Sequence, residues 1–428
     1  MDARCVKCVA VFLTCSVAFS ACVHENVTGD DHVDAVPYLV AEPEMRLGDV
    51  DDPDVGFSRV GGVEVDRDGN LYVMEASIPE IRVFAPDGAL IRTFGRRGEG
   101  PGDFQVTPRF GVVGDTVWAV SIYPDRITLF DRRGNLLSAR RAESVAVPLP
   151  TGYGYVSPWR MRSDGVFTSH FASVRFPRDS PPTGVGPTDS IPFPFVLFDA
   201  MGAVRDTIGW APRPPPRMWS PPSDADPDFD FVEAGGRRLI VPRPPLTIPW
   251  WESLPDGYVL VDAPPAQTAA NGLFTVTRFG LAGDTVYHRA LQYRPVPYSG
   301  ADLDSIAARA ARGEPGGGVP YSPNASAPPD WEAIAPTLRA AMSFPEFKLP
   351  VESVWLAQDE SIWLRLSQAD QAVDVWLILD DSGHPRGKLE LPSRTRIFWA
   401  RDDTFWAVET DELGIPWVVR YTTFVDPG

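Results

Sequence analysis

The chain has 428 residues, of which 44% are hydrophobic, and it contains 13 Trp, so it can bury a large core. Its formal net charge of -18 disfavours nucleic acid and anionic membrane surfaces as broad partners, because both would repel the protein at long range. All four cysteines lie at or before position 22, so the body of the chain has no thiol for disulfide bonding or nucleophilic catalysis.

The first 21 residues have the pattern of an export signal. Arg4 and Lys7 precede an apolar run that is too short to span a bilayer permanently. The segment FSAC at 19–22 resembles the bacterial lipobox, whose cysteine is lipidated and becomes the first residue of the mature chain. We therefore predict lipidation at Cys22, with an ordinary cleaved signal as the alternative. Val23 in the next position favours the outer membrane, by resemblance to enterobacterial sorting.

Residues 22–36 are acidic and show no strand pattern, so we expect a flexible tether there and a folded domain over 37–428.

Two kinds of short hairpin pattern alternate along that domain. Each consists of an apolar strand, a turn that carries Asp or Gly, and a return strand. Asp-Gly at 68–69, 87–88, 164–165 and 256–257 would supply the positive φ that tight hairpin turns need. One kind occurs at 63–75, 112–121, 160–170, 254–262, 356–366 and 399–409, and the other at 81–94, 127–137, 195–208, 274–288 and 375–391. Alternating hairpins of this type predict a ring of four-stranded antiparallel blades, a β-propeller.

The last blade lacks one strand. After 399–409 the chain offers a single further strand at 417–424. The stretch 38–47 can supply the missing strand by pairing beside it, which would close the ring and remove an exposed edge. We therefore predict an all-β fold, a six-bladed propeller that is closed by its N-terminal strand.

Three insertions interrupt the hairpins, at about 181–194, 211–251 and 295–350. The first two are crowded with proline, which blocks ladder hydrogen bonds and favours extended loops. The third contains two helical patterns, 301–313 and 330–342, and Pro336 is expected to break the second. Loops on one face of the ring are the simplest interpretation, and contacts with a ligand or another subunit are the alternative.

Residues 61–104 resemble a known family. The strand-turn-strand VEVDRDGNLYV, the hairpin IRVFAPDGALIRTFG and the loop GRRGEGPGDF are similar to the blade pattern of NHL-like, six-bladed propeller lipoproteins. The resemblance implies the propeller fold and export, and it implies no activity, because most members of that family have none assigned.

Familiar catalytic and metal motifs are poorly represented. The loop GRRGEGPG lacks the lysine and serine of a P-loop, and the histidines form no zinc-ligand cluster. The run DRDGN at 66–70 resembles the start of an EF-hand loop without its distal glutamate, so a hairpin turn is expected and calcium is the minor alternative. We predict no bound metal and no other cofactor.

A set of arginines is the sharpest candidate site. They occur where the chain enters an inner strand, and inner strands of a propeller line its axis. Guanidinium groups from several blades would then offer bidentate donors to a carboxylate, a phosphate or an acidic sugar, and an indole could add a stacking surface. The predicted ligand-binding residues are Arg59, Arg109, Trp159, Arg160 and Arg394, and the alternative is that these arginines are solvated or paired with carboxylates.

These features leave three functional interpretations. The first is a lipid-anchored, extracytoplasmic binding module without catalysis, whose partner is an envelope protein or an anionic small molecule or saccharide, and not nucleic acid. The second is a metal-dependent propeller hydrolase resembling the lactonase and gluconolactonase group, with Glu64, Glu75 and Glu352 as candidate ligands. The third is a structural partner of an export assembly.

Overall fold

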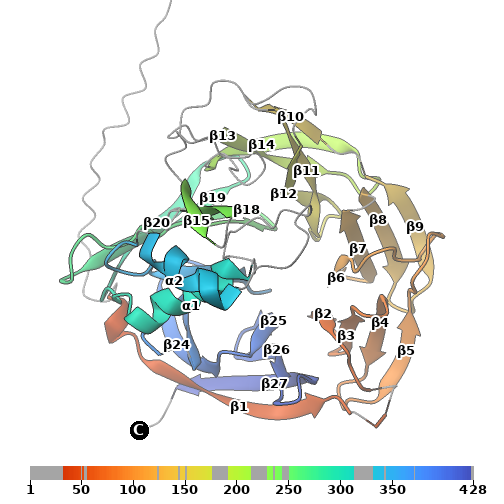
Figure 1. The fold of residues 1–428 in the computed structure, drawn as a ribbon. Coiled ribbons are helices and arrows are strands. Elements are labelled where there is room, and N and C mark those ends of the chain that lie inside the picture. Colours follow the sequence, from red (N-terminus) through yellow and green to blue (C-terminus); the bar gives the residue numbers. More distant parts are fainter. Residues whose placement is uncertain are drawn as a thin grey trace, which may run out of the picture.

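The regular structure is almost entirely β-sheet, and the sheets stand around a common axis like the blades of a propeller (Figure 1). The computed structural model describes residues 32–49, 51–52, 55–122, 125–142, 145–149, 152–175, 191–213, 229–234, 237–242, 250–312, 331–341, 344–370 and 372–425. Cys22 and the predicted signal lie outside these residues.

Three four-stranded sheets and one five-stranded sheet follow the chain order, each built from successive hairpins. The first contains β2 (Val60–Val65), β3 (Leu71–Glu75), β4 (Glu80–Phe84) and β5 (Leu90–Phe94). The second contains β6 (Arg109–Val113), β7 (Thr116–Ile122), β8 (Asp125–Asp131) and β9 (Leu136–Arg141). The five-stranded sheet contains β10 (Val145–Leu149), β11 (Gly152–Met161), β12 (Phe167–Arg175), β13 (Ile191–Phe198) and β14 (Val204–Arg213). The remaining four-stranded sheet contains β17 (Trp250–Leu254), β18 (Gly257–Asp262), β19 (Gly272–Gly280) and β20 (Thr285–Tyr293).

The last sheet has eight strands and joins the two ends of the folded chain. Its order is β21 (Val351–Leu356), β22 (Ile362–Leu366), β23 (Val373–Leu379), β24 (Pro385–Pro392), β1 (Tyr38–Leu47), β27 (Pro416–Val425), β26 (Thr404–Thr410) and β25 (Arg396–Arg401). β1 runs antiparallel to β27 from Leu39 to Leu47, which confirms the predicted closure by the N-terminal strand. It also pairs in parallel with β24, through Tyr38 and Leu39.

The core lies between neighbouring sheets. Met74 and Ile81 of the first sheet pack in one cluster with Val117 and Phe130 of the second. Trp118 of the second sheet meets Phe167 of the next edge to face, with ring centroids 5.7 Å apart. Since neighbouring sheets pack face to face, a strand such as β3 is buried along its whole length, whereas β5 and β9 remain partly exposed.

The turn chemistry is confirmed at three of the four Asp-Gly positions. Gly69, Gly88 and Gly165 have φ values of 81°, 89° and 80°. Gly257 does not take positive φ, because the turn falls one residue earlier and Leu254 pairs directly with Gly257. A Cβ at Gly257 would lie 1.9 Å from the carbonyl oxygen of Phe279, so this position needs glycine for its close backbone approach.

The proposed tether boundary at residue 36 is wrong. Residues 33–35 form a short 3-10 helix, η2 (Val33–Ala35), and Val33 and Val36 are buried. They pack with Leu291 and Tyr293 of β20 in one apolar cluster. The chain is therefore fixed to the ring from His32 onward, where an isolated bridge joins it to Gln292.

The prediction of extended loops in the two proline-rich insertions is also wrong in part. Residues 191–194 belong to β13, and β15 (Phe229–Ala234) pairs with β16 (Arg237–Pro242) inside the second insertion. β13 pairs with β12 only near its C-terminal end, through Leu197 and Phe198. Pro192 and Pro194 are tolerated because they lie outside this paired part.

The third insertion contains both expected helices, α1 (Gly300–Ala311) and α2 (Trp331–Ala341), which pack against each other. Pro336 does not break α2, which continues through it. Within the described part of the chain, no helix is long and apolar enough to cross a membrane.

Removal of β1 should destabilise the ring. A chain that begins at residue 49 exposes the ladder edges of β24 and β27, and we expect a loss of at least about 3 kcal/mol in the free energy of unfolding. Urea unfolding measures this change. A chain that begins at residue 32 is the control and should unfold like the full protein, and equal stability of the two shortened chains would contradict the closure.

Candidate functional site

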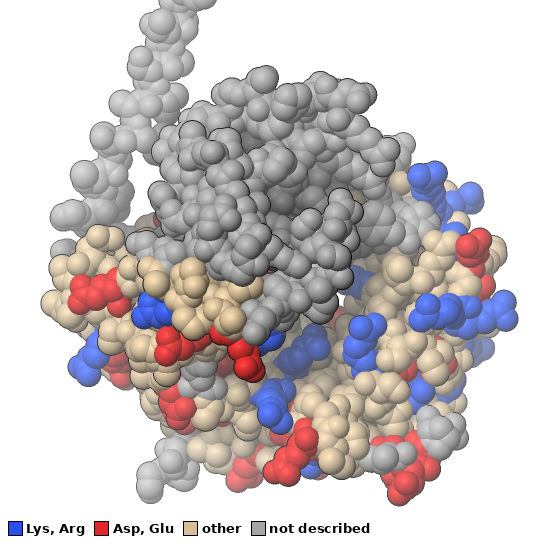
Figure 2. Space-filling view, viewed as in Figure 1, with Lys and Arg blue, Asp and Glu red and all other residues tan. Residues whose placement is uncertain are grey.

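The inner strands bring polar side chains together from opposite parts of the sequence. β2, β6, β17, β21 and β25 each begin or end a sheet, and β11 is the second strand of the five-stranded sheet. Neighbouring members of this set are in contact: β25 with β2, β2 with β6, β6 with β11, and β17 with β21. Figure 2 shows several Lys and Arg side chains beside the hollow in the middle of this face, and others around its rim. The chain therefore places several cations beside its central hollow, although its net charge is -18.

Bulges on these strands re-aim their side chains. The register of β11 against β12 shifts between Pro158 and Arg160, which places Trp159 at the irregularity. β2, β21 and β25 have comparable shifts near their starts. An extra residue of this kind bends a strand and turns a side chain out of the regular alternation, and such bulges are frequent next to functional sites.

Three contacts define the centre of the site. The guanidinium carbon of Arg109 lies 3.3 Å from the ring centroid of Trp159, a stacked cation-π contact. Arg160 donates through Nη2 to Oε1 of Gln358 at 3.2 Å, and Gln358 in turn donates through Nε2 to Oε2 of Glu64 at 3.3 Å. These residues come from four different sheets. We call Glu64, Arg109, Arg160, Glu252 and Gln358 the axial cluster.

The two carboxyl groups of the axial cluster are held partly protonated near neutral pH. Burial raises the pKa of Glu64 to about 8, against the opposing charges of Arg160, Arg109 and Arg401. Burial likewise raises the pKa of Glu252 to about 7, against Arg109 and Arg160. Desolvation therefore outweighs the nearby cations at both carboxyls.

Burial shifts the pKa of Arg109 in the opposite direction, because it disfavours the charged form of a base as well as of an acid. Burial lowers its pKa to about 10, although Glu252 and Glu64 act to raise it. Arg109 is nevertheless exposed, and Glu64 and Glu252 are only half-buried. Side chains that are surrounded by protein yet still accessible are expected where polar groups line an internal channel.

The structure places three of the five predicted ligand residues in one group. Arg109, Trp159 and Arg160 lie together, but the indole stacks on Arg109 and so already has a cationic partner on that face. Arg59 is exposed and donates to the carbonyl of Ala76, and Arg394 is exposed in the turn before β25. Among the described contacts, neither joins the axial cluster.

Of the three candidate metal ligands, only Glu64 reaches the axial cluster. The carboxylate of Glu75 accepts hydrogen bonds from the backbone amides of Ser58 and Ser77, and Glu352 accepts one from Ser367 and pairs with Arg365. In the part of the chain that the structure describes, no three His, Cys, Asp or Glu side chains gather closely enough to hold a metal ion. Glu64, Glu75 and Glu352, the candidate ligands of the alternative interpretation, therefore do not lie together among the described residues.

The other motifs of the first blades are turns. Asp66 accepts hydrogen bonds from the backbone of Asp68 and Asn70 and from the hydroxyl of Tyr72, and it pairs with Arg132. In the Gly-rich loop, the amide of Gly100 donates to Asp103, whose other oxygen accepts from Arg96. The amides that an anion would need at Gly98 and Gly100 are thus already engaged by the loop itself.

Three contributors to the site were not predicted: Glu252, Gln358 and Arg401. The position of Glu252 could have indicated a role, since it stands two residues before the end of its inner strand in the apolar run WWESL. Burying a carboxylate in such a run costs free energy unless other polar groups compensate it. Gln358 lies in the turn after β21, and nothing local distinguishes it from other turn residues.

Comparisons with known proteins assign no family to the chain. No known family profile matches the chain, and no curated protein matches it. Among solved structures, a Bacteroides fragilis protein whose assignment as exported is itself provisional has 11% identity and a TM-score of 0.42, over 92% of this chain and 98% of its own. A member of the DUF4221 family from Bacteroides vulgatus has 9% identity and a TM-score of 0.38, over 91% and 99%. An aldose sugar dehydrogenase from Streptomyces coelicolor has 12% identity and a TM-score of 0.37, over 91% and 100%.

At these TM-scores, no residue role, ligand or activity transfers from those proteins to this chain. The resemblance to NHL-like lipoproteins stays a prediction, and the site must be judged on its own geometry.

Glu64→Gln tests the electrostatics of the axial cluster. Since the folded pKa of about 8 exceeds the ordinary value of 4.5, protonation of Glu64 stabilises the fold below about pH 4.5, and this contribution disappears as the pH rises toward 8. Relative to Glu64→Gln, the wild type should therefore lose about 1–3 kcal/mol of unfolding free energy between pH 5 and pH 8. Urea unfolding at both pH values measures the difference.

Glu412→Gln, at an exposed turn residue, is the control and should show no such dependence on pH. A Glu64→Gln effect of equal size at pH 5 and pH 8 would rule out the raised pKa.

Proposed function

We propose that this protein is an exported, lipid-anchored six-bladed propeller that binds a small organic anion at the axial cluster without transforming it. One observation carries the proposal: two arginines and two carboxyl groups from four separate inner strands act on one another at the axis. Charged groups are costly to hold inside a protein, so their convergence favours a binding role over a purely structural one.

The count of six blades is supported by the eight-stranded sheet. It divides into two units of four, β21 to β24 and β25 to β27 with β1, which meet where β1 runs beside β24 over two residue pairs. These two units and four further groups of four strands make six four-stranded blades around the axis. The four further groups are β2 to β5, β6 to β9, β11 to β14 and β17 to β20.

The expected ligand carries a carboxylate or phosphate together with hydroxyl groups, as an acidic sugar does. Guanidinium groups of Arg109 and Arg160 offer several donors with fixed geometry to an anionic oxygen. Protonated Glu64 and Glu252 can donate one hydrogen bond each, and the amide of Gln358 can both donate and accept. When the two carboxyls are protonated, the cluster is a net cation, so anion binding and proton uptake favour each other.

The metal-dependent hydrolase is not supported by the donor set. The two carboxyls of Glu64 and Glu252 beside two arginines, with Glu75 and Glu352 engaged elsewhere, provide too few oxygen ligands for a calcium or zinc ion of catalytic type. We therefore derive no reaction through a metal.

The anion site is tested by Arg109→Met and Arg160→Met. We expect each to weaken the binding of D-glucuronate at least tenfold, because each removes a bidentate donor. Arg394→Met is the matched control, since Arg394 is an exposed arginine outside the axial cluster, and it should bind as the wild type does. Isothermal titration with glucuronate, succinate and phosphate provides the measurement.

Affinity in the wild type should fall about tenfold or more between pH 6 and pH 8.5, as Glu252 and then Glu64 ionise and repel the anion. If the arginine variants bind like the wild type, or if no member of the panel binds, the proposed function is wrong.

Anchoring is tested by Cys22→Ser in the native host. Metabolic labelling with an alkyne fatty acid should label the wild type and the control Cys15→Ser, but not Cys22→Ser. The variant should also leave the membrane fraction, because the acyl chains provide its membrane affinity. Labelling of Cys22→Ser would contradict lipidation at this residue.

A further inference from the structure

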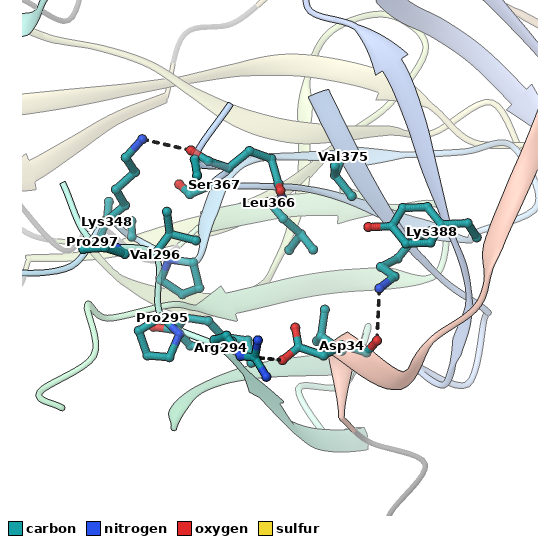
Figure 3. A pocket seen from close by; sticks show the side chains of 17 residues that line it. Asp34, Arg294, Pro295, Val296, Pro297, Lys348, Leu366, Ser367, Val375 and Lys388 are labelled. Atoms are coloured by element: carbon teal, nitrogen blue, oxygen red, sulfur yellow. Dashed lines mark hydrogen bonds and ion pairs between the residues drawn. The ribbon is translucent and has the colours of Figure 1, made fainter. Parts of the chain in front are cut away.

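A cavity lined by residues outside the axial cluster lies where the N-terminal segment docks on the ring. Its volume is about 260 Å³. Its walls come from residues 33–38, from the chain after β20 at 293–297, from 348–350 before β21, from 366–369 after β22, and from Val375 and Lys388 on β23 and β24. Figure 3 shows these side chains around the space between Lys348, Leu366 and Lys388.

Lys388 is the unusual residue of this cavity. Its side chain is buried, with 6% of the residue exposed, yet its ammonium group has one hydrogen bond in the described chain, to the carbonyl of Asp34 at 3.3 Å (Figure 3). It also lies 4.4 Å from the ring centroid of Tyr38. An ammonium group has three protons to donate, so these contacts leave it poorly compensated. Burial accordingly lowers the pKa of Lys388, although Asp34 and Glu390 act to raise it.

Lys348, in the same cavity, is a buried lysine whose charge is compensated by an ion pair and a hydrogen bond. It is buried to a similar extent, and its Nζ lies 2.8 Å from Oδ1 of Asp302 and 2.9 Å from the carbonyl of Gln368. That lysine ties α1 to the ring and has a structural role. No carboxylate oxygen of the described residues lies within ion-pair distance of Lys388, although Asp34 supplies its backbone carbonyl next to it.

The rest of the cavity is suited to an apolar body with one anionic end. Pro295, Val296, Pro350, Leu366 and Val375 give it an aliphatic lining. Arg294 stands beside it with its side chain 83% exposed, and its Nε is 3.9 Å from Oδ2 of Asp34, so these two side chains form an ion pair next to the cavity. An anion in the cavity would meet an under-compensated buried cation, which makes a charge-assisted hydrogen bond strong.

We propose that this cavity is a second binding site, which takes a small monocarboxylate with an apolar body, held by its carboxylate on Nζ of Lys388. The site is independent of the axial cluster, since it shares no residue with it. A molecule of about the size of benzoate or hexanoate matches the cavity.

Benzoate and hexanoate are the probes, with benzamide as the neutral isostere. Isothermal titration on the full chain should detect both acids and no binding of benzamide. Lys388→Met, which keeps the aliphatic stem and removes the charge, should weaken benzoate at least tenfold. Arg394→Met is the matched control, since Arg394 is exposed and lies outside both sites, and it should leave benzoate binding unchanged.

Crystals soaked in 4-iodobenzoate locate the molecule. The anomalous peak of iodine should lie among Leu366, Val375 and Pro295, with the carboxylate toward Lys388. Lys388→Met should also keep or raise the melting temperature of the protein without ligand, because it removes a poorly compensated buried charge.

The proposal is wrong if benzamide binds as well as benzoate, if Lys388→Met binds benzoate like the wild type, or if neither acid binds at 10 mM (about the weakest affinity of interest). It is also wrong if Lys388→Met loses benzoate only together with a marked fall in melting temperature, since Lys388 would then serve to anchor the N-terminal segment. Loss of glucuronate binding in Arg109→Met, with benzoate retained, keeps the two sites distinct.

Discussion

The pairing of β1 with β27 is the interaction on which the rest of the structure depends. It joins a strand that begins at Tyr38 to one that ends at Val425, so the whole folded chain lies within one closed circuit of sheets. β1 covers the edge of β27 on one side and touches β24 on the other, which leaves neither as a free template for association. A ring closed in this way holds its inner strands at fixed positions, and only then can single residues on those strands meet at the axis.

Salt bridges between hairpin turns reinforce the same arrangement. Arg278 of β19 pairs with Asp256 in its own sheet and with Glu360 in the next. Arg132, in the turn after β8, pairs with Asp66 and Asp68 of the preceding sheet, and Arg386 of β24 pairs with Asp403 in the turn after β25. Each alone contributes modestly because most of these partners are accessible to water. Together they keep neighbouring sheets in register, so that Glu64 and Gln358, 294 positions apart, remain within hydrogen-bond distance.

Local pattern predicted most of the fold and little of the site. Hairpins such as 63–75 can be predicted from alternating apolar residues and a turn that contains glycine, because both signals act within a few residues. The same rules failed at Pro336 and Pro194, where packing and a free ladder side make proline acceptable. Arg109, Trp159 and Arg160 could be predicted to converge because inner strands share an axis. Glu252 and Gln358 could not, because burial by distant sheets, and not any local motif, makes their positions special. Likewise, the hydrogen bond that partly compensates the charge of Lys388 goes to the carbonyl of Asp34, which lies 354 positions away.

Hydrogen exchange followed peptide by peptide tests the closure most directly. If the ring is one cooperative unit, the amides of β1, β27 and β2 should exchange together, at the slow rate set by global unfolding. Exchange of β1 several orders of magnitude faster than that of β27, with β27 and β2 still protected, would show that the N-terminal strand does not hold the ring shut, and it would contradict the account.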